Sequence, residues 1–150
     1  MKVVIQRVSE ASVTIEESCV AEIKQGLLIL LGITQDDTNK DVDWLVTKII
    51  NLRIFSDERH VMNLSVKDVG GELIVVSQFT LHASTKKGNR PSYINAAKPE
   101  TAILIYKKFV DALQLAFGKH IQTGQFGADM KISLINDGPV TIVIDSKNKF

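Results

Sequence analysis

The sequence predicts an α+β protein with a mainly antiparallel, barrel-like β-sheet and two amphipathic helices. Three observations support this fold class: several β-rich runs, two segments with helical spacing of apolar residues, and an order without regular βαβ alternation. We find no internal repeat, linker or low-complexity tract, so a single domain over residues 1–150 is expected.

Four β segments are predicted in the first part of the chain. Residues 1–8 alternate loosely and are rich in β-branched side chains. Two β-rich runs, 12–15 and 20–23, lie on either side of a polar turn and indicate a short hairpin. Residues 27–33, which follow Gly26, are almost wholly apolar, and this is typical of a central strand buried on both faces.

The first helix is predicted over residues 42–50, where apolar residues recur with the spacing of an amphipathic helix. Thr38 followed three residues later by Asp41 resembles a capping box and marks the expected start. A strand is expected at 52–55, and the polar stretch 56–69 carries no clear pattern.

The next strand is predicted over Gly70–Leu81, and its character changes along its length. Four aliphatic residues are followed by Ser77, Gln78 and Thr80, with Phe79 between them. A strand that ends in hydroxyl and amide groups presents them at a rim that a ligand can reach. The alternative is a strand that merely becomes polar as it reaches the surface.

The last third of the chain predicts a loop, a helix and two β segments. The loop spans 82–97, and the helix begins at Pro99 and ends at Gly118, as proline at a first turn and glycine after a last turn suggest. The β segments are 130–135 and 140–145, and we expect the intervening Asn136-Asp137-Gly138-Pro139 to form a tight turn.

Composition is that of a globular protein, with 45% apolar and 23% charged residues. No apolar run approaches the roughly 20 residues that span a bilayer, so no membrane partner is expected. The single cysteine, Cys19, cannot form an internal disulfide, and a cytoplasmic location is the simplest expectation.

The net charge of +1 argues against a protein that coats nucleic acid nonspecifically. One segment differs: residues 85–108 contain six basic residues and one acidic residue, Glu100. This segment is either a solvated face or an edge that contacts phosphates, with Lys86, Lys87 and Arg90 as weak candidates.

The sequence offers few conventional catalytic groups. Its three histidines, His60, His82 and His120, lie far apart and outside any metal-ligand spacing, so we expect neither a metal nor a cofactor. Ser77 or Thr80 is a possible nucleophile, but a hydroxyl needs a neighbouring base and none is evident. A hydrolase built from these residues would take its base or its charge stabilisation from backbone amides or from the substrate.

Two stretches, Ser77-Gln78-Phe79-Thr80 and Gly138-Pro139-Val140-Thr141, together resemble the signature pair of the D-aminoacyl-tRNA deacylases. Further segments read as that family, in the family's order, and extend the resemblance to nearly the whole chain. These segments are 6–8, 52–55, 87–92 and 123–130.

The resemblance implies a carboxylic ester hydrolase that releases free D-amino acid and tRNA, and that acts on glycyl-tRNA as well. It also implies that the 2′-hydroxyl of the tRNA assists catalysis and that no cofactor is needed. Gly138-Pro139 would be a cis dipeptide whose carbonyls reject L-amino acids, and it would enter the active site of the neighbouring subunit of a homodimer.

Roles for further residues follow from the same resemblance. Thr80 would orient the ester or a water, and Arg7 would brace the dipeptide or the pocket wall unless it forms only a surface ion pair. Phe126 and Met130 would border the adenosine or aminoacyl end unless they are ordinary core residues. The aminoacyl pocket would be lined by Ser77, Gln78, Phe79 and Thr80, and the tRNA phosphates would be contacted by Lys86, Lys87 and Arg90.

Two other functions stay open from the sequence. One is a noncatalytic module that binds RNA 3′ ends through the basic segment 85–108 and the rim at Thr80, which the lack of a histidine, metal or acid pair favours. The other is a small-molecule esterase in which Thr80 is the nucleophile, and which would form a trappable acyl-enzyme.

Overall fold

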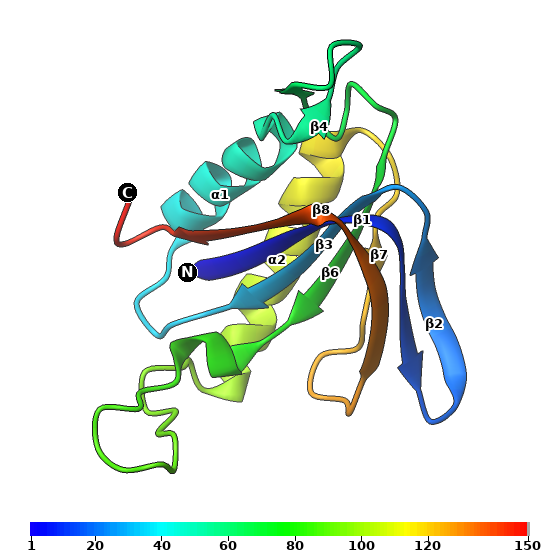
Figure 1. Cartoon of the computed structure of the whole chain (residues 1–150). Helices are drawn as coiled ribbons and strands as arrows, with labels where there is room; N and C mark the ends of the chain where they lie inside the picture. Colours follow the sequence, from blue (N-terminus) through cyan, green and yellow to red (C-terminus); the bar gives the residue numbers. More distant parts are fainter. Residues whose placement is uncertain (150) are drawn as a thin grey trace.

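A computed structural model describes residues 1–149 (Figure 1). Six of its strands form one sheet in the order β2-β1-β3-β6-β7, with β8 pairing β1 from the other side. The strands of this sheet are β1 (Lys2–Ile15), β2 (Ser18–Ile23), β3 (Gly26–Gly32), β6 (Glu72–Ser77), β7 (Gln122–Thr123) and β8 (Lys131–Asp145). The other elements are α1 (Asn39–Asn51), β4 (Phe55–Ser56), β5 (Met62–Leu64), the 3₁₀ helix η1 (Phe79–His82) and α2 (Pro99–Phe117).

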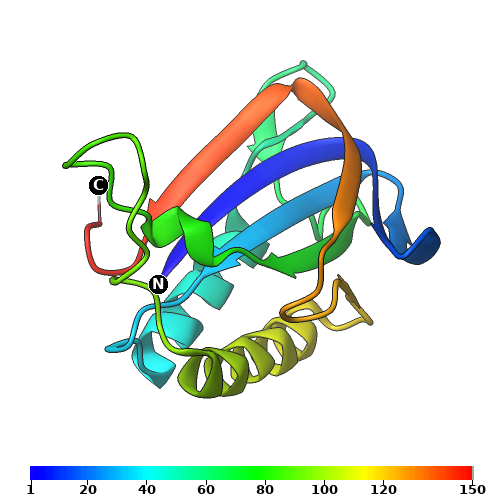
Figure 2. The same ribbon diagram turned by 90° about the horizontal axis from the view of Figure 1, so that it is seen from below.

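The main sheet is strongly curved and nearly closes on itself. Strand β1 pairs with β3 over its first half and with β2 over its second half, while β8 follows it along both halves. The second half of β1 and the first half of β8 bend away from the helices (Figures 1 and 2), and β2 comes to lie against β6 and β7. The predicted barrel-like α+β fold is therefore confirmed.

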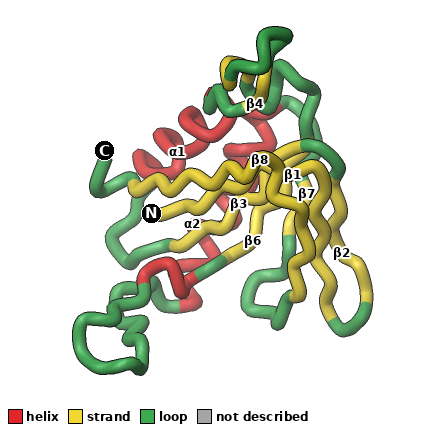
Figure 3. The backbone as a smooth tube through the Cα atoms, viewed as in Figure 1, coloured by secondary structure: helices red, strands yellow, loops and turns green. Residues whose placement is uncertain are grey.

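The sheet is mixed, because β3 pairs with β6 and β6 with β7 in parallel. The expectation that the chain lacks βαβ units was wrong on this point. Helix α1 connects β3 to β6, and α2 connects β6 to β7, both on the same face of the sheet (Figures 1 and 3). The small β4–β5 hairpin and the loop after η1 lengthen these connections and hide the alternation in the sequence.

Strands β3 and β6 are buried on both faces, as the apolar run of β3 predicts. Alternate residues such as Leu27 and Leu73 face the helices and join the core built around Leu45 and Phe109. Their neighbours, such as Leu28, belong to a second apolar cluster inside the curved half of the sheet. Because each face packs against its own core, a shift of one residue in register would misplace both sets of side chains.

Both helices begin and end close to the predicted positions. The Asp41 carboxylate accepts a hydrogen bond from the Thr38 backbone N–H at 2.9 Å, which confirms the capping box at the start of α1. Pro99 is the first residue of α2, and Gly118 ends it with a left-handed backbone (φ 83°) that favours glycine.

Strand β6 ends at Ser77, so the predicted strand to Leu81 is too long by four residues. The Gln78 N–H donates to the Leu31 carbonyl at 2.7 Å, and this is where pairing with β3 stops. The Ala83 N–H then donates to the Thr80 carbonyl at 3.0 Å, closing the turn of η1. The polar residues therefore leave the sheet in a tight 3₁₀ turn.

The stretch Asn136–Pro139 is not a turn, which corrects the prediction of two separate β segments. It lies within β8, whose residues 137–140 have no Cα partner on β1 while Gln6 pairs with Thr141 and Val8 with Asn136. The Gly138–Pro139 peptide bond is cis. Proline has no N–H for a ladder hydrogen bond, and a bulge is one of the few places where a strand accommodates it. No helix among the described residues is long and apolar enough to cross a membrane.

We expect Phe109→Ala to lower the free energy of unfolding by about 3–5 kcal/mol, because it removes a fully buried aromatic side chain from the core between the helices and the sheet. Leu115→Ala on the same helix is the control, since Leu115 is 85% exposed and its truncation should change the free energy by less than about 0.5 kcal/mol. Urea denaturation followed by circular dichroism measures both. Equal effects of the two variants would contradict the assigned core.

Candidate functional site

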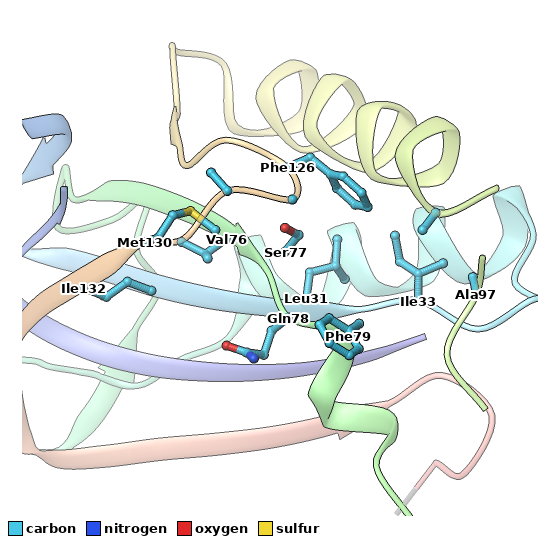
Figure 4. Close-up of a pocket in the computed structure, with 13 residues that line it drawn as sticks. Leu31, Ile33, Val76, Ser77, Gln78, Phe79, Ala97, Phe126, Met130 and Ile132 are labelled. Atoms are coloured by element: carbon cyan, nitrogen blue, oxygen red, sulfur yellow. The ribbon is translucent and has the colours of Figure 1, made fainter. Parts of the chain in front are cut away.

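A cavity of about 270 Å³ opens where β6 ends (Figure 4). Its floor is formed by the ends of β3 and β6, and its walls by the start of α2 and by the segment that joins β7 to β8. The lining residues are Leu31, Ile33, Val76, Ser77, Gln78, Phe79, Ala97, Ala102, Phe126, Gly127, Ala128, Met130 and Ile132. An apolar cavity with a few polar groups at one side is the usual form of a small-ligand site.

The structure brings together predicted site residues that lie far apart in the sequence. Ser77 is the last residue of β6 and Gln78 and Phe79 lead into η1, whereas Phe126 and Met130 come from the segment before β8 (Figure 4). All five line the same cavity. The hydroxyl of Ser77 and the amide of Gln78 are its polar side chains.

Thr80 does not line the cavity, but it is tied to a residue that does. The Gln78 Nε2 amide donates a hydrogen bond to Thr80 Oγ1. Since the threonine oxygen accepts this bond, its own O–H is left to donate elsewhere. None of the residues that line the cavity is an acid, a base or a histidine.

Arg7 of β1 contacts the bulge in β8 and holds its backbone in place. Its Nε donates to the Asp137 carbonyl at 3.0 Å, and its Nη1 donates to the Ile54 carbonyl at 2.6 Å. A Cβ on Gly138 would lie 2.8 Å from Arg7 Nη2, and the φ of Gly138 is +127°, so only glycine suits this position. Arg7 is 9% exposed, and its ion pair with the Asp137 carboxylate is longer, at 3.6 Å.

Gly138 and Pro139 do not line the cavity of their own chain. Both residues are exposed, on a strand whose one described partner is β1. The two stretches that resemble the deacylase signature therefore occupy separate places on a single chain.

Sequence reasoning missed the apolar side of the cavity. Leu31 contributes because β3 pairs with β6 in parallel and places it opposite Ser77, a register that the sequence does not reveal. Ala97 and Ala102 contribute through the start of α2, and small residues give no functional signal. Tyr106 supports the wall from behind: its ring centroid lies 5.6 Å from that of Phe126, and burial raises the pKa of its hydroxyl to about 12.

The candidate phosphate ligands Lys86, Lys87 and Arg90 lie in the loop between η1 and α2 and are all exposed. None of them forms an ion pair with a residue of the described part of the chain. Residues 1–149 contain no group of three or more His, Cys, Asp or Glu side chains placed to hold a metal ion.

The nearly closed sheet with two helices on one face defines the structural class. The same fold occurs in a solved structure described as a probable eukaryotic D-amino acid tRNA deacylase, with a TM-score of 0.82, 14% identity, and coverage of 95% of this chain and 97% of the other. At this identity the likeness concerns the fold alone.

The chain belongs to the D-Tyr-tRNA(Tyr) deacylase family, which it matches over residues 4–145. Curated relatives named D-aminoacyl-tRNA deacylase include proteins of Flavobacterium psychrophilum, 69% identical, and Bacteroides thetaiotaomicron, 62% identical, each aligned over 99% of both chains. A solved structure titled c-Myc DNA Unwinding Element Binding Protein is 41% identical, with a TM-score of 0.92 and coverage of 97% and 98%. The chain is thus an enzyme of this hydrolase family.

His82 should make the fold less stable in weak acid. Burial is the main cause that lowers the pKa of its imidazole, and Nε2 is buried without a hydrogen-bond partner among the described residues. Because the unfolded chain binds the proton more tightly, stability is present above the unfolded pKa of about 6.5 and is lost as the pH falls below it. We expect His82→Gln to reduce the difference in unfolding free energy between pH 7.5 and pH 5.5.

The same substitution at the exposed His120 is the matched control and should leave that difference unchanged. Urea denaturation at the two pH values provides the measurement. If the His82→Gln variant and the wild-type protein lose the same unfolding free energy between pH 7.5 and pH 5.5, the role given to His82 is incorrect.

Proposed function

We propose that this chain hydrolyses the ester bond of D-aminoacyl-tRNA and releases free D-amino acid and tRNA. The observation that carries the proposal is the cavity at the end of β6, where Ser77, Gln78 and Phe79 of one signature stretch meet Phe126 and Met130. Membership of the deacylase family supplies the substrate class. A cavity of about 270 Å³ suits the aminoacyl group and part of the terminal adenosine, and the rest of the tRNA would remain outside.

The proposed catalysis relies on placement of the ester. Thr80 accepts a hydrogen bond from Gln78, so its O–H is oriented to donate to the ester or to an attacking water. The side-chain hydrogen bond described for Thr80 comes from the Gln78 amide, which is not a base, so Thr80 lacks the base that a nucleophile needs. We therefore assign Thr80 a positioning role, with the vicinal 2′-hydroxyl of the ribose assisting the attack.

Selection against L-amino acids would come from Gly138 and Pro139 of a second copy of the chain. In one chain the dipeptide is exposed and lies outside the cavity lining, and β8 presents an edge with no described partner beyond β1. We propose a homodimer in which the dipeptide of each protomer enters the cavity of the other. Its main-chain carbonyls would then face the substrate α-carbon and exclude the L side chain by steric and polar conflict.

The buried Arg7 would keep this selective surface rigid, since it holds the Asp137 carbonyl directly before the dipeptide. Exclusion of this kind acts on a side chain, so a glycyl ester is not fully rejected. Lys86, Lys87 and Arg90 would contact phosphates of the tRNA outside the cavity.

Purified protein should release D-tyrosine from D-Tyr-tRNA and leave L-Tyr-tRNA almost untouched, without added metal or cofactor. The measurement is the loss of aminoacylated tRNA over time for each enantiomer. Binding of tRNA without turnover would favour the RNA 3′-end module, and equal rates on the two enantiomers would exclude the proposed selection. A trapped acyl-enzyme on Thr80 would replace the positioning role with nucleophilic catalysis.

Pro139→Ala should raise the rate on L-Tyr-tRNA relative to D-Tyr-tRNA. The pyrrolidine ring fixes the backbone φ, and alanine allows the carbonyls of the bulge to move away from the substrate. Pro91→Ala, in the exposed loop after η1, is the matched control and should keep the wild-type ratio. The ratio of the two kcat/KM values is the readout, and an unchanged ratio for Pro139→Ala would count against the dipeptide as the filter.

A further inference from the structure

The loop between η1 and α2 carries a strong excess of positive charge. Residues 83–98 contain Lys86, Lys87, Arg90 and Lys98 and no acidic residue. All four side chains are exposed and form no ion pair with residues 1–149. In a chain of net charge +1, this local excess favours a polyanionic partner over a protein surface of mixed charge.

The same loop exposes large apolar side chains beside these charges. Tyr93 is 42% exposed and Ile94 is 85% exposed. The Tyr93 ring packs edge-on against Phe79, with ring centroids 5.0 Å apart and an interplanar angle of 72°. Phe79 is itself 56% exposed and lines the cavity, so Tyr93 lies at the outer rim of the site (Figure 4 shows Phe79 at this edge).

Backbone hydrogen bonds hold this part of the loop in place. Ser84 and Ser92 exchange N–H···O bonds of 2.8 and 2.9 Å, so the residue before Tyr93 is paired across the loop. Further along, the Ala97 N–H donates to the Ile33 carbonyl at 2.9 Å and ties the end of the loop to the floor of the cavity. Tyr93 is therefore presented at a defined place beside the cavity mouth, although the loop projects from the sheet (Figures 1 and 3).

We propose that Tyr93, with Ile94, is a stacking platform for the unpaired nucleotides that precede the terminal adenosine of the tRNA. This inference rests on the proposed function and extends it from the aminoacyl end to the adjoining RNA. Aromatic side chains beside basic residues are the usual means of binding single-stranded RNA, because bases stack on the rings while the cations neutralise phosphates. The exposed face of Tyr93 is open to a nucleotide base, and the four cationic side chains are free to contact the phosphates of the RNA.

Two substrates separate this role from a role inside the cavity. The first is D-Tyr-tRNA, and the second is 3′-O-D-tyrosyl-adenosine, which ends at the terminal nucleoside and lacks the nucleotides that the platform is proposed to bind. For Tyr93→Ala we expect KM for D-Tyr-tRNA to rise about five- to a hundredfold, the range expected from loss of one stacked base, with kcat nearly unchanged. Hydrolysis of tyrosyl-adenosine should remain at the wild-type rate, and Tyr93→Phe should restore KM for the tRNA.

An equal loss on both substrates would show that Tyr93 acts only by supporting Phe79, and no change on either would show that RNA does not use this surface. Both results overturn the proposal while leaving the deacylase activity of the wild-type enzyme intact.

A binding measurement tests the platform even if the wild-type protein hydrolyses neither substrate. Fluorescence anisotropy with a short single-stranded RNA of the tRNA 3′-terminal sequence should show weaker binding to Tyr93→Ala, with an unchanged dependence of log K on log salt. Lys87→Ala should instead reduce that salt dependence, because it removes a phosphate contact. Equal affinity of the wild-type and Tyr93→Ala proteins for this RNA would also overturn the proposal.

Discussion

The parallel pairing of β3 with β6 is the constraint on which the site depends. Both strands are buried on two faces, so two separate cores fix their register and place Leu31 opposite Ser77. The pairing ends with the hydrogen bond from Gln78 N–H to the Leu31 carbonyl, and the chain then turns out of the sheet into η1. Polar side chains are thus delivered to the end of an apolar strand pair, where the cavity begins. A change in register would move the hydroxyl and amide groups away from it.

A second constraint acts at the other signature stretch. Strands β1 and β8 pair along most of their length, yet four residues of β8 remain unpaired opposite Arg7. A buried guanidinium needs acceptors, and Arg7 finds them in the carbonyls of Ile54 and Asp137. The bond to Asp137 holds the backbone of the bulge against Arg7. The guanidinium then lies so close to Gly138 that a side chain at this position would collide with it. The position of the dipeptide is fixed by one chain, while its proposed use requires a second chain.

Local patterns predicted those elements whose causes are local. The apolar run of β3, the capping box at Thr38, and the proline and glycine at the ends of α2 each act within a few residues. Predictions failed where distant segments decide the outcome: the parallel partner of β6 depends on crossovers through two helices, and Gly138-Pro139, a usual turn sequence, lies in a strand because β1 and Arg7 hold it there. The same division applies to the site. The polar residues of β6 could be found from the sequence, whereas Leu31 and Ala97 could not.

The walls of the cavity are attached to the strand that ends in it. The Val75 carbonyl on β6 accepts hydrogen bonds from the Tyr106 hydroxyl of α2, at 3.2 Å, and from the Gly124 N–H that follows β7, at 3.1 Å. One acceptor therefore holds both the helix behind Phe126 and the start of the segment that carries Phe126 and Met130. Rejection of an enantiomer by steric conflict works only if the site cannot expand to admit the wrong side chain. Since floor and walls share β6 as their support, widening the cavity would disturb a strand that is buried on both faces, so the proposed dipeptide of a second copy would act against a rigid site.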